Sequence, residues 1–185
     1  MCIRDSAGIT PGTPHLLASS GLINLPPQPY GYVRCGIVLY GASADSDRLD
    51  LWPVLSLKAR IATVRCLRPG ESAGYALAFQ AQRPTRLAVA AIGYGDGLPR
   101  TLPQLGAEAL LHGRRVKMVG RMCMDQLLLD VTDLENVQPG DMITLIGRDG
   151  GSAITAVELA ERCQTLPNEV LSQLSAARLG LITQT

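Results

Sequence analysis

Hydrophobic and polar residues alternate in the middle of the chain, as they do in β-strands. Between residues 52 and 67 one face carries the hydrophobic residues Leu55, Leu57, Ala59 and Ile61. Polar side chains occupy the other face, and the parity reverses when Val64 and Cys66 take the hydrophobic positions. We therefore predict one long strand with a bulge near Ala62 or Thr63.

Short turn sequences recur through the rest of this region. They are Pro69-Gly70, Gly95-Asp96-Gly97, His112-Gly113, Pro139-Gly140-Asp141 and Asp149-Gly150-Gly151. Between them lie runs rich in leucine and β-branched residues, at 86–94, 127–131 and 142–146. Many short strands at such spacing predict a mainly β fold, a barrel or a sandwich.

The two ends of the chain follow different patterns. Prolines interrupt the first 41 residues five times, and residues 42–51 are small, polar and acidic, which is typical of an exposed connection. We place a domain boundary there, with residues 1–48 before it and 49–185 after it. Near the other end, Thr155 to Glu158 forms a capping box, and Pro167 begins a second helical stretch that we expect to reach Ala177.

Composition excludes several classes of function. The 17 lysines and arginines balance 16 aspartates and glutamates, so no net charge attracts nucleic acid or an anionic membrane surface. The longest apolar run, Leu87 to Ile92, is too short to span a bilayer. Five separated cysteines and two histidines form neither a disulfide framework nor a zinc site. We expect reduced thiols in a cytoplasmic protein and no bound metal.

Individual chemical signals in the sequence are ambiguous. The glycine cluster at 93–97 follows a predicted strand, but its third glycine comes one residue early and Pro99 follows where a helix should run, so a dinucleotide-binding loop is excluded. Tyr75 alone fits a half-buried aromatic better than an acid or base, and Asp125 alone fits a capping or ion-pair residue. The methionines and cysteine at 122–124 alone fit core positions better than a site.

Taken together, these segments resemble the alanine racemase family. The resemblance rests on Gly74-Tyr75, on residues 92–97 against I-G-Y-x-D-G, on 119–126 against V-G-R-x-x-M-D-Q, and on His15, Ser19, 33–37 and 39–41 upstream. It implies a bacterial enzyme with an N-terminal (β/α)8 barrel that binds pyridoxal phosphate on a lysine. A β-rich C-terminal domain follows and reaches into the partner subunit's active site. Residues 1–48 would be the last part of the barrel, and 49–185 the C-terminal domain.

The resemblance also implies roles for particular residues. Tyr75 would exchange the Cα proton on one face of the amino acid, and the cofactor lysine would serve the other face. The cofactor would be held by Ser19, Gly36 and Ile37 at its phosphate and by Arg34 at its pyridine nitrogen. The substrate region would include Met124, Tyr94, Asp125 and Asn168, with Arg100 and Arg121 at the entrance.

These roles agree with elementary chemistry. Racemisation needs a base on each face of Cα, and a tyrosine serves only where positive charge stabilises its anion. An arginine at the pyridine nitrogen restrains the electron sink and disfavours side reactions such as transamination. Small residues and backbone N–H groups near Gly36 suit a phosphate. The expected partners are a small amino-acid substrate, alanine or serine, and a second copy of the chain.

Two features depart from the family pattern. The only lysines are Lys58, on the polar face of a predicted strand, and Lys117, in the basic hairpin at 114–117. Both fit solvated surface residues better than a cofactor site, so we expect the isolated chain to be inactive as a fragment of a longer protein. Where ordinary alanine racemases have Tyr-Glu, this chain has Asn168-Glu169, which is similar to the serine/alanine racemases of vancomycin resistance. Such proteins carry a membrane domain ahead of the racemase, and in the cell they supply D-amino acids for peptidoglycan.

A second hypothesis is a free-standing β-barrel module, derived from a racemase, that binds a protein or small ligand without catalysis. The family context of Tyr75, Tyr94 and Met124 favours a working racemase, since a module has no use for them. An uninterrupted reading frame upstream of Met1, encoding a barrel with a cofactor lysine, would distinguish the two.

Overall fold

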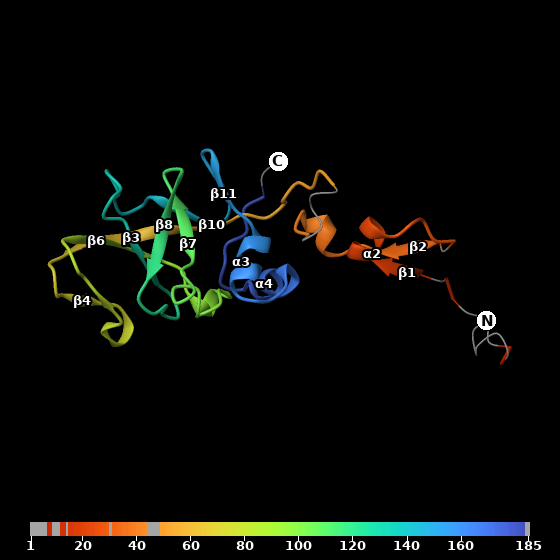
Figure 1. Ribbon diagram of the computed structural model, residues 1–185, viewed down its shortest axis with the longest axis horizontal. Helices are drawn as coiled ribbons and strands as arrows, with labels where there is room; N and C mark the ends of the chain where they lie inside the picture. The colour runs from red at the N-terminus through yellow and green to blue at the C-terminus, as the bar shows by residue number, and fades with distance from the viewer. Residues whose placement is uncertain (1–6, 9–11, 14, 30, 44–48, 184–185) are drawn as a thin grey trace. The chain divides into compact units, whose positions relative to one another are not determined.

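The computed structural model describes residues 7–8, 12–13, 15–29, 31–43 and 49–183 (Figure 1). The chain divides into two compact units, Met1–Val54 and Leu55–Thr185, and each is described by itself. The boundary predicted after residue 48 lies next to residues 44–48, which are outside the described ranges.

The N-terminal unit contains a small parallel β-α-β arrangement. Strands β1 (His15–Ala18) and β2 (Tyr32–Arg34) pair in parallel, and α2 (Ser19–Asn24) lies between them in sequence. A short 3-10 helix, η1 (Ile37–Tyr40), follows. The connection is the kind that parallel strands require, because a tight hairpin cannot join them.

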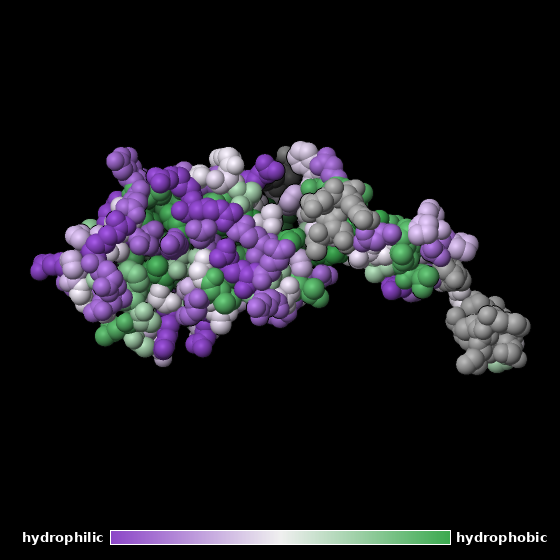
Figure 2. Space-filling view, in the orientation of Figure 1, coloured by the Kyte–Doolittle hydropathy of each residue, from purple (hydrophilic) through white to green (hydrophobic). Residues whose placement is uncertain are grey.

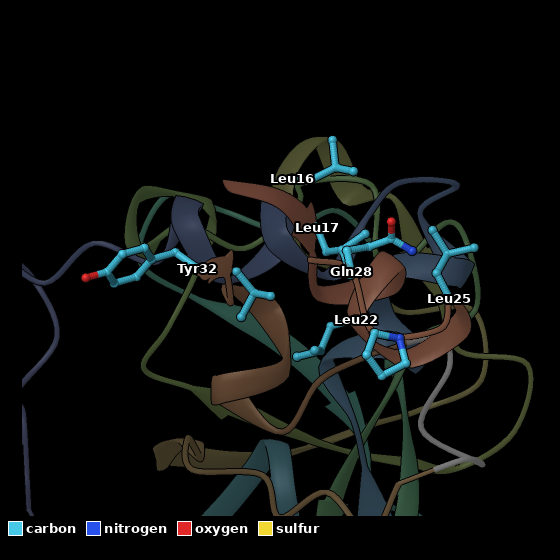
Figure 3. Close-up of a pocket in the computed structure, with 8 residues that line it drawn as sticks. Leu16, Leu17, Leu22, Leu25, Gln28 and Tyr32 are labelled. Carbon is cyan, nitrogen blue, oxygen red and sulfur yellow. The ribbon is translucent and has the colours of Figure 1, made fainter. Parts of the chain in front are cut away.

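Hydrophobic side chains are exposed on this unit. They line a pocket of about 250 Å³ whose wall includes Leu16, Leu17, Leu22, Leu25, Gln28 and Tyr32 (Figure 3). Figure 2 shows hydrophobic residues (green) among hydrophilic ones over the same unit. Only Leu17 and Ser19 of the β1 and α2 segments are buried. The unit therefore has little core of its own.

The C-terminal unit is built on a seven-stranded antiparallel sheet in the order β11-β10-β3-β6-β9-β8-β7. The strands are β3 (Leu57–Leu67), β6 (Thr85–Ala90), β7 (Glu108–Leu111), β8 (Arg114–Val119), β9 (Leu127–Asp130), β10 (Met142–Asp149) and β11 (Ser152–Ile154). An additional pairing of β10 with β7, at Thr144 and Leu110, closes the sheet into a barrel-like ring. The predicted mainly β, barrel-like fold is confirmed.

Strand β3 shows both the predicted alternation and the predicted bulge. Leu57, Ala59 and Ile61 are buried, and the residues between them are exposed. The register against β6 shifts between Ile61 and Thr63, which leaves an extra residue on β3. The predicted start of the strand was wrong, because residues 52–56 precede β3 without strand structure.

The core lies inside the ring and is made by inward-facing residues of the sheet. Its fully buried side chains include Ile61, Leu110, Leu127, Leu129, Ile143 and Leu145. Burying each of these side chains stabilises the fold by roughly 1.5–3 kcal/mol. The ring therefore forms a rigid base for the loops that leave it.

Two short helices end the chain, as predicted. Helix α3 (Ala156–Arg162) begins at its N-cap Thr155, whose side chain accepts a hydrogen bond from the Glu158 amide at 3.0 Å. Helix α4 (Pro167–Gln173) packs against α3 and begins at the proline. It ends four residues before the predicted Ala177, because the chain becomes extended at Leu174 and bonds to another loop.

A small hairpin projects from the ring beside β6 (Figure 1). Strands β4 (Ser72–Ala73) and β5 (Phe79–Gln80) pair antiparallel, and a 3-10 turn, η3 (Tyr75–Leu77), joins them. The apolar run predicted as a strand over 86–94 is shorter in the structure, because β6 ends at Ala90 and residues Tyr94–Asp96 form the 3-10 turn η4.

The described residues contain no group of histidine, cysteine and carboxylate side chains that could hold a metal ion. Their four cysteines, Cys35, Cys66, Cys123 and Cys163, are free thiols. None of the helices in these same ranges combines the length and the apolar character that crossing a bilayer requires.

Candidate functional site

Tyr75 lies at the tip of the β4–β5 hairpin and is 66% exposed. The two residues after it, Ala76 and Leu77, have left-handed backbone conformations with φ of 56° and 52°. This region is unfavourable for residues with a Cβ, so the tip is held under backbone strain. The sequence pattern gave no indication of this strain.

The second motif forms the tight turn η4. The Asp96 side chain accepts a hydrogen bond from the Gly93 amide at 2.8 Å and is buried. Gly93 allows the turn to lie directly on the segment at 121–126, since a Cβ there would come within 2.2 Å of the Cys123 carbonyl oxygen. The Tyr94 amide donates to that same carbonyl at 3.2 Å, and the Gly95 amide donates to the Met124 carbonyl at 2.9 Å.

The third motif contacts both of the others. On one side, its residues Cys123 and Met124 hold the η4 turn. On the other side, a Cβ at Gly74 would lie 3.1 Å from Leu128 Cδ1 and 4.0 Å from the Arg121 amide nitrogen. The three segments that sequence analysis singled out in this unit therefore meet around residues 120–128.

Met124 combines two properties that suit a binding role. The residue is half exposed, and its carbonyl oxygen accepts a hydrogen bond from the Gly95 amide, which fixes its backbone. Its amide N–H has no hydrogen-bond acceptor within the described ranges. A backbone donor without an acceptor in these ranges, on a half-exposed residue, is suited to an anionic group such as a carboxylate.

Asp125 follows directly and is also exposed, with a hydrogen-bonded ion pair to Arg178. Arg178 also donates to the buried Asp96, with Nε 3.0 Å from Oδ1. The hydrogen bond to Asp96, and after it the hydrogen bond to Asp125, raise the pKa of the Arg178 guanidinium above its ordinary value. The arginine therefore stays charged. Sequence analysis missed Arg178, which belongs to none of the recognised motifs.

The structure does not join Arg100, Arg121 or Asn168 to this centre through a side-chain hydrogen bond among the described residues. Arg100 and Arg121 are exposed, and no ion pair or side-chain hydrogen bond of either is found among the described residues.

Asn168 is exposed in the first turn of α4. The other end of that helix contacts the η4 turn, since a Cβ at Gly97 would lie 2.0 Å from the Gln173 carbonyl oxygen. Five residues of helix, about 8 Å, separate the two points.

The N-terminal unit brings together the residues predicted to hold a phosphate. The buried Ser19 hydroxyl accepts hydrogen bonds from the amides of Gly36 at 3.1 Å and Val38 at 3.5 Å. The Ile37 amide has no acceptor in the part of the chain that the structure describes, and open space lies beside the Gly36 Cα. A free amide, a hydroxyl and room beside glycine fit a phosphate group.

Arg34 is exposed near this group, and its Nη1 lies 2.8 Å from His15 Nδ1. Since the arginine can only donate, Nδ1 must accept, which fixes His15 with its hydrogen on Nε2. His15 thereby orients the guanidinium. The sequence showed His15 as part of a motif, but it did not indicate this contact.

A family model for the alanine racemase C-terminal domain matches residues 54–180. The chain belongs to the alanine racemase family. An amino-acid racemase of Enterococcus faecalis is 39% identical over 183 residues, which are 96% of this chain and 25% of that protein. The alanine racemase of Stutzerimonas stutzeri is 38% identical over 164 residues, 86% of this chain and 44% of the relative.

Solved racemase structures show the same fold. The chain superposes on the alanine racemase of Bacillus anthracis with bound L-Ala-P at a TM-score of 0.85 and 32% identity, over 93% of this chain and 45% of that one. It superposes on the Bartonella henselae alanine racemase with covalently bound pyridoxal phosphate at 0.80 and 29% identity, over 92% and 47%. The chain therefore spans between a quarter and about half of the length of these racemases.

Proposed function

We propose that this chain is the C-terminal part of a pyridoxal-phosphate-dependent racemase of alanine, serine or both, with Tyr75 as one of its two bases. The observation that carries the proposal is the arrangement around residues 120–128. Tyr75 is exposed at the tip of a strained, projecting hairpin. The base of that hairpin, at Gly74, packs against the segment that carries the Met124 amide, which has no acceptor within the described ranges.

The proposal gives each residue a task that is compatible with its geometry. Tyr75, at a projecting tip, accepts and returns the Cα proton on one face. The Met124 amide binds the substrate carboxylate, and Tyr94 and Asp125 border that position, with Arg100 and Arg121 nearer the entrance. Exposure of the phenol on a fixed turn allows it to reach a substrate held elsewhere.

The N-terminal unit supports a cofactor role. Ser19, Gly36 and Ile37 would hold the phosphate of pyridoxal phosphate, and Arg34, oriented by His15, would face its pyridine nitrogen. When bound, the cofactor withdraws electrons from the bonds at the amino-acid Cα. Lys58 and Lys117 are exposed on strands of the ring, so the attachment lysine is assigned to a barrel that residues 1–48 complete.

A shared active site in a homodimer follows from the same assignment. Tyr75 belongs to the ring unit and the cofactor lysine to the barrel, and the projecting hairpin is suited to enter the partner's site. Mixing a Tyr75→Phe chain with a lysine-deficient chain, each in the complete protein, should restore part of the activity, because one of two sites is then intact. No restoration under proven subunit exchange would contradict the shared site.

Serine use and cell-wall precursor supply are the finer parts of the proposal. Asn168, an exposed amide where a tyrosine is expected in alanine racemases, supports serine as a substrate. The Enterococcus faecalis amino-acid racemase is much longer than the match, which supports a further domain in the parent. The resemblance to serine/alanine racemases of vancomycin resistance would make that domain a membrane anchor. The four free thiols support a bacterial cytoplasmic location for this part.

The deciding experiment is racemisation by the complete protein, with this chain behind a lysine-bearing family barrel. Tyr75→Phe keeps the ring and removes the proton carrier, so kcat/KM should fall at least about 100-fold in both directions. Tyr32→Phe, at another exposed tyrosine, is the matched control and should retain activity. Near-normal racemisation by Tyr75→Phe would overturn the role of Tyr75.

A further inference from the structure

Three segments that are far apart in sequence meet at one junction in the ring unit. The η4 turn lies on residues 121–126 through the amides of Tyr94 and Gly95. The segment after α4 lies on the other side of the turn, where the Ser175 amide donates to the Asp96 carbonyl at 3.0 Å. The C-terminal segment is therefore part of the support of the substrate loop.

Arg178 is the side chain that joins all three segments. Its Nε donates to Asp96 Oδ1 at 3.0 Å, and its Nη2 donates to Asp125 Oδ1. The guanidinium carbon lies 3.4 Å from the place of a Cβ at Gly95, an ordinary van der Waals distance, so the group packs against the turn. One arginine thus connects the end of the chain to both loops.

The two carboxylates that it contacts are in different situations. The Asp96 side chain is 10% exposed, and its other oxygen accepts a hydrogen bond from the Gly93 amide, so it is a buried anchor for the arginine, whose own side chain is 44% exposed. The Asp125 side chain is 63% exposed, and Arg178 is its only hydrogen-bond partner within the described ranges. Without the arginine, Asp125 would be an uncompensated negative charge.

Asp125 directly follows Met124, whose amide is the donor assigned to the substrate carboxylate. Two carboxylates at neighbouring positions repel each other, and the repulsion weakens binding of the one that is free to leave. A guanidinium held on Asp125 removes most of this repulsion and also fixes the position of the loop.

We propose that Arg178 is a positioning residue that holds the Met124–Asp125 loop and neutralises Asp125, and thereby sets the affinity for the substrate carboxylate. This inference rests on the proposed racemase function. It assigns substrate recognition to a residue that makes no contact with the amino acid, because it acts through Asp125 and the η4 turn.

The test uses the complete racemase with Arg178→Gln and Arg178→Lys. For Arg178→Gln, KM for alanine should rise roughly tenfold, the scale of a lost charged hydrogen bond, while kcat stays within about twofold. Arg178→Lys keeps the charge and should recover part of the loss. Arg148→Gln, at an exposed arginine with no hydrogen bond in the described ranges, is the matched control and should leave both constants unchanged.

The double variant Arg178→Gln with Asp125→Asn separates charge from structural damage. If uncompensated charge causes the loss, the second substitution restores KM toward the starting value, whereas a simple loss of stability would not be corrected. An unchanged KM in Arg178→Gln, or no recovery in the double variant, would overturn the proposal.

Amide hydrogen exchange in residues 121–126 gives a readout that does not need catalysis. Exchange should accelerate in Arg178→Gln and not in Arg148→Gln, whatever reaction the protein performs. If the parent shows no racemisation while exchange responds in this way, the proposed function fails and the positioning of the loop stands. Unchanged exchange together with an active parent would reject the positioning role alone.

Discussion

Gly74 and Leu128 are in close contact where the Tyr75 hairpin meets strand β9. A Cβ on Gly74 would lie 3.1 Å from Leu128 Cδ1, and the glycine has φ of +80°. Leu128 projects from the outer face of the ring, opposite to its buried neighbours Leu127 and Leu129. Leu128 therefore packs against the base of the hairpin, and glycine is favoured at position 74 by its positive φ and by this close approach.

This contact predicts the effect of Gly74→Ala. The added methyl must both adopt a backbone conformation that side chains disfavour and displace Leu128, so we expect a loss of roughly 1–3 kcal/mol in the free energy of unfolding. Gly70→Ala is the matched control, since Gly70 has φ of +88° but open space around it. Urea denaturation of both variants separates strain from contact. Equal losses in the two would show that Leu128 gives no support.

Ala76→Gly tests the strain beside Tyr75. Glycine adopts the observed φ of 56° without penalty, so the variant should be more stable by about 1 kcal/mol. Ala78→Gly is the control on the same hairpin, because Ala78 has ordinary helical angles and glycine there should destabilise by about 0.5–1 kcal/mol. Thermal unfolding measures both. Destabilisation of equal size in the two variants would mean that the turn is not strained.

The sequence predicted those parts of the fold that depend on local pattern. The alternation in β3 and its bulge could be predicted from the sequence. An extra residue in a strand moves the following hydrophobic side chains to the opposite position of the alternating pattern. The start of α3 was readable from Thr155 and Glu158, since a cap is a local hydrogen bond. These signals involve neighbours in sequence.

The parts that depend on distant contacts were not predictable. Helix α4 was expected to reach Ala177, but the amide of Ser175 bonds to Asp96 and ends it early. The bridge from Arg178 to Asp96 joins residues 82 positions apart, and no local pattern marks it. Tyr75 entered through family resemblance, while the strain that holds it became visible only in the backbone angles.

Glu158 gives a prediction for pH. Arg115 donates two hydrogen bonds to its carboxylate, at 2.6 and 2.9 Å, and thereby lowers the pKa of Glu158 against the opposing effect of partial burial. A lowered folded-state pKa means that the stabilisation is complete above the ordinary value of about 4.3 and is lost as the pH falls through the folded value. The pair is partly exposed, so its contribution is roughly 0.5–1 kcal/mol.

Glu158→Gln should therefore reduce stability at pH 7 and converge with the parent protein at strongly acidic pH. Glu161→Gln, at an exposed position on the same helix without an ion pair in the described ranges, is the control and should leave stability nearly unchanged at both pH values. Urea denaturation across the acidic range measures the difference. A gap between Glu158→Gln and the parent that persists at low pH would contradict the ion-pair origin.

The last prediction concerns Asn168, which presents an amide from the first turn of α4 and is exposed. An amide can donate to or accept from a hydroxyl, and the β-hydroxyl is the only difference between serine and alanine. In the complete racemase, Asn168→Tyr removes this partner and adds bulk. We expect it to lower kcat/KM for serine more than for alanine, by about 1–2 kcal/mol of relative transition-state binding.

Asn168→Ala distinguishes the two causes, because it removes the amide without filling the space. If the hydrogen bond sets the preference, Asn168→Ala should lower the ratio of kcat/KM for the substrate serine to kcat/KM for the substrate alanine. The decrease should be nearly as large as in Asn168→Tyr. If crowding sets it, Asn168→Ala should leave the ratio close to that of the parent. Both substitutions are at an exposed helix position, so thermal unfolding should change little and the kinetic ratio reports on the site. A ratio that neither variant changes would show that Asn168 does not set the preference and would place substrate selectivity in the barrel.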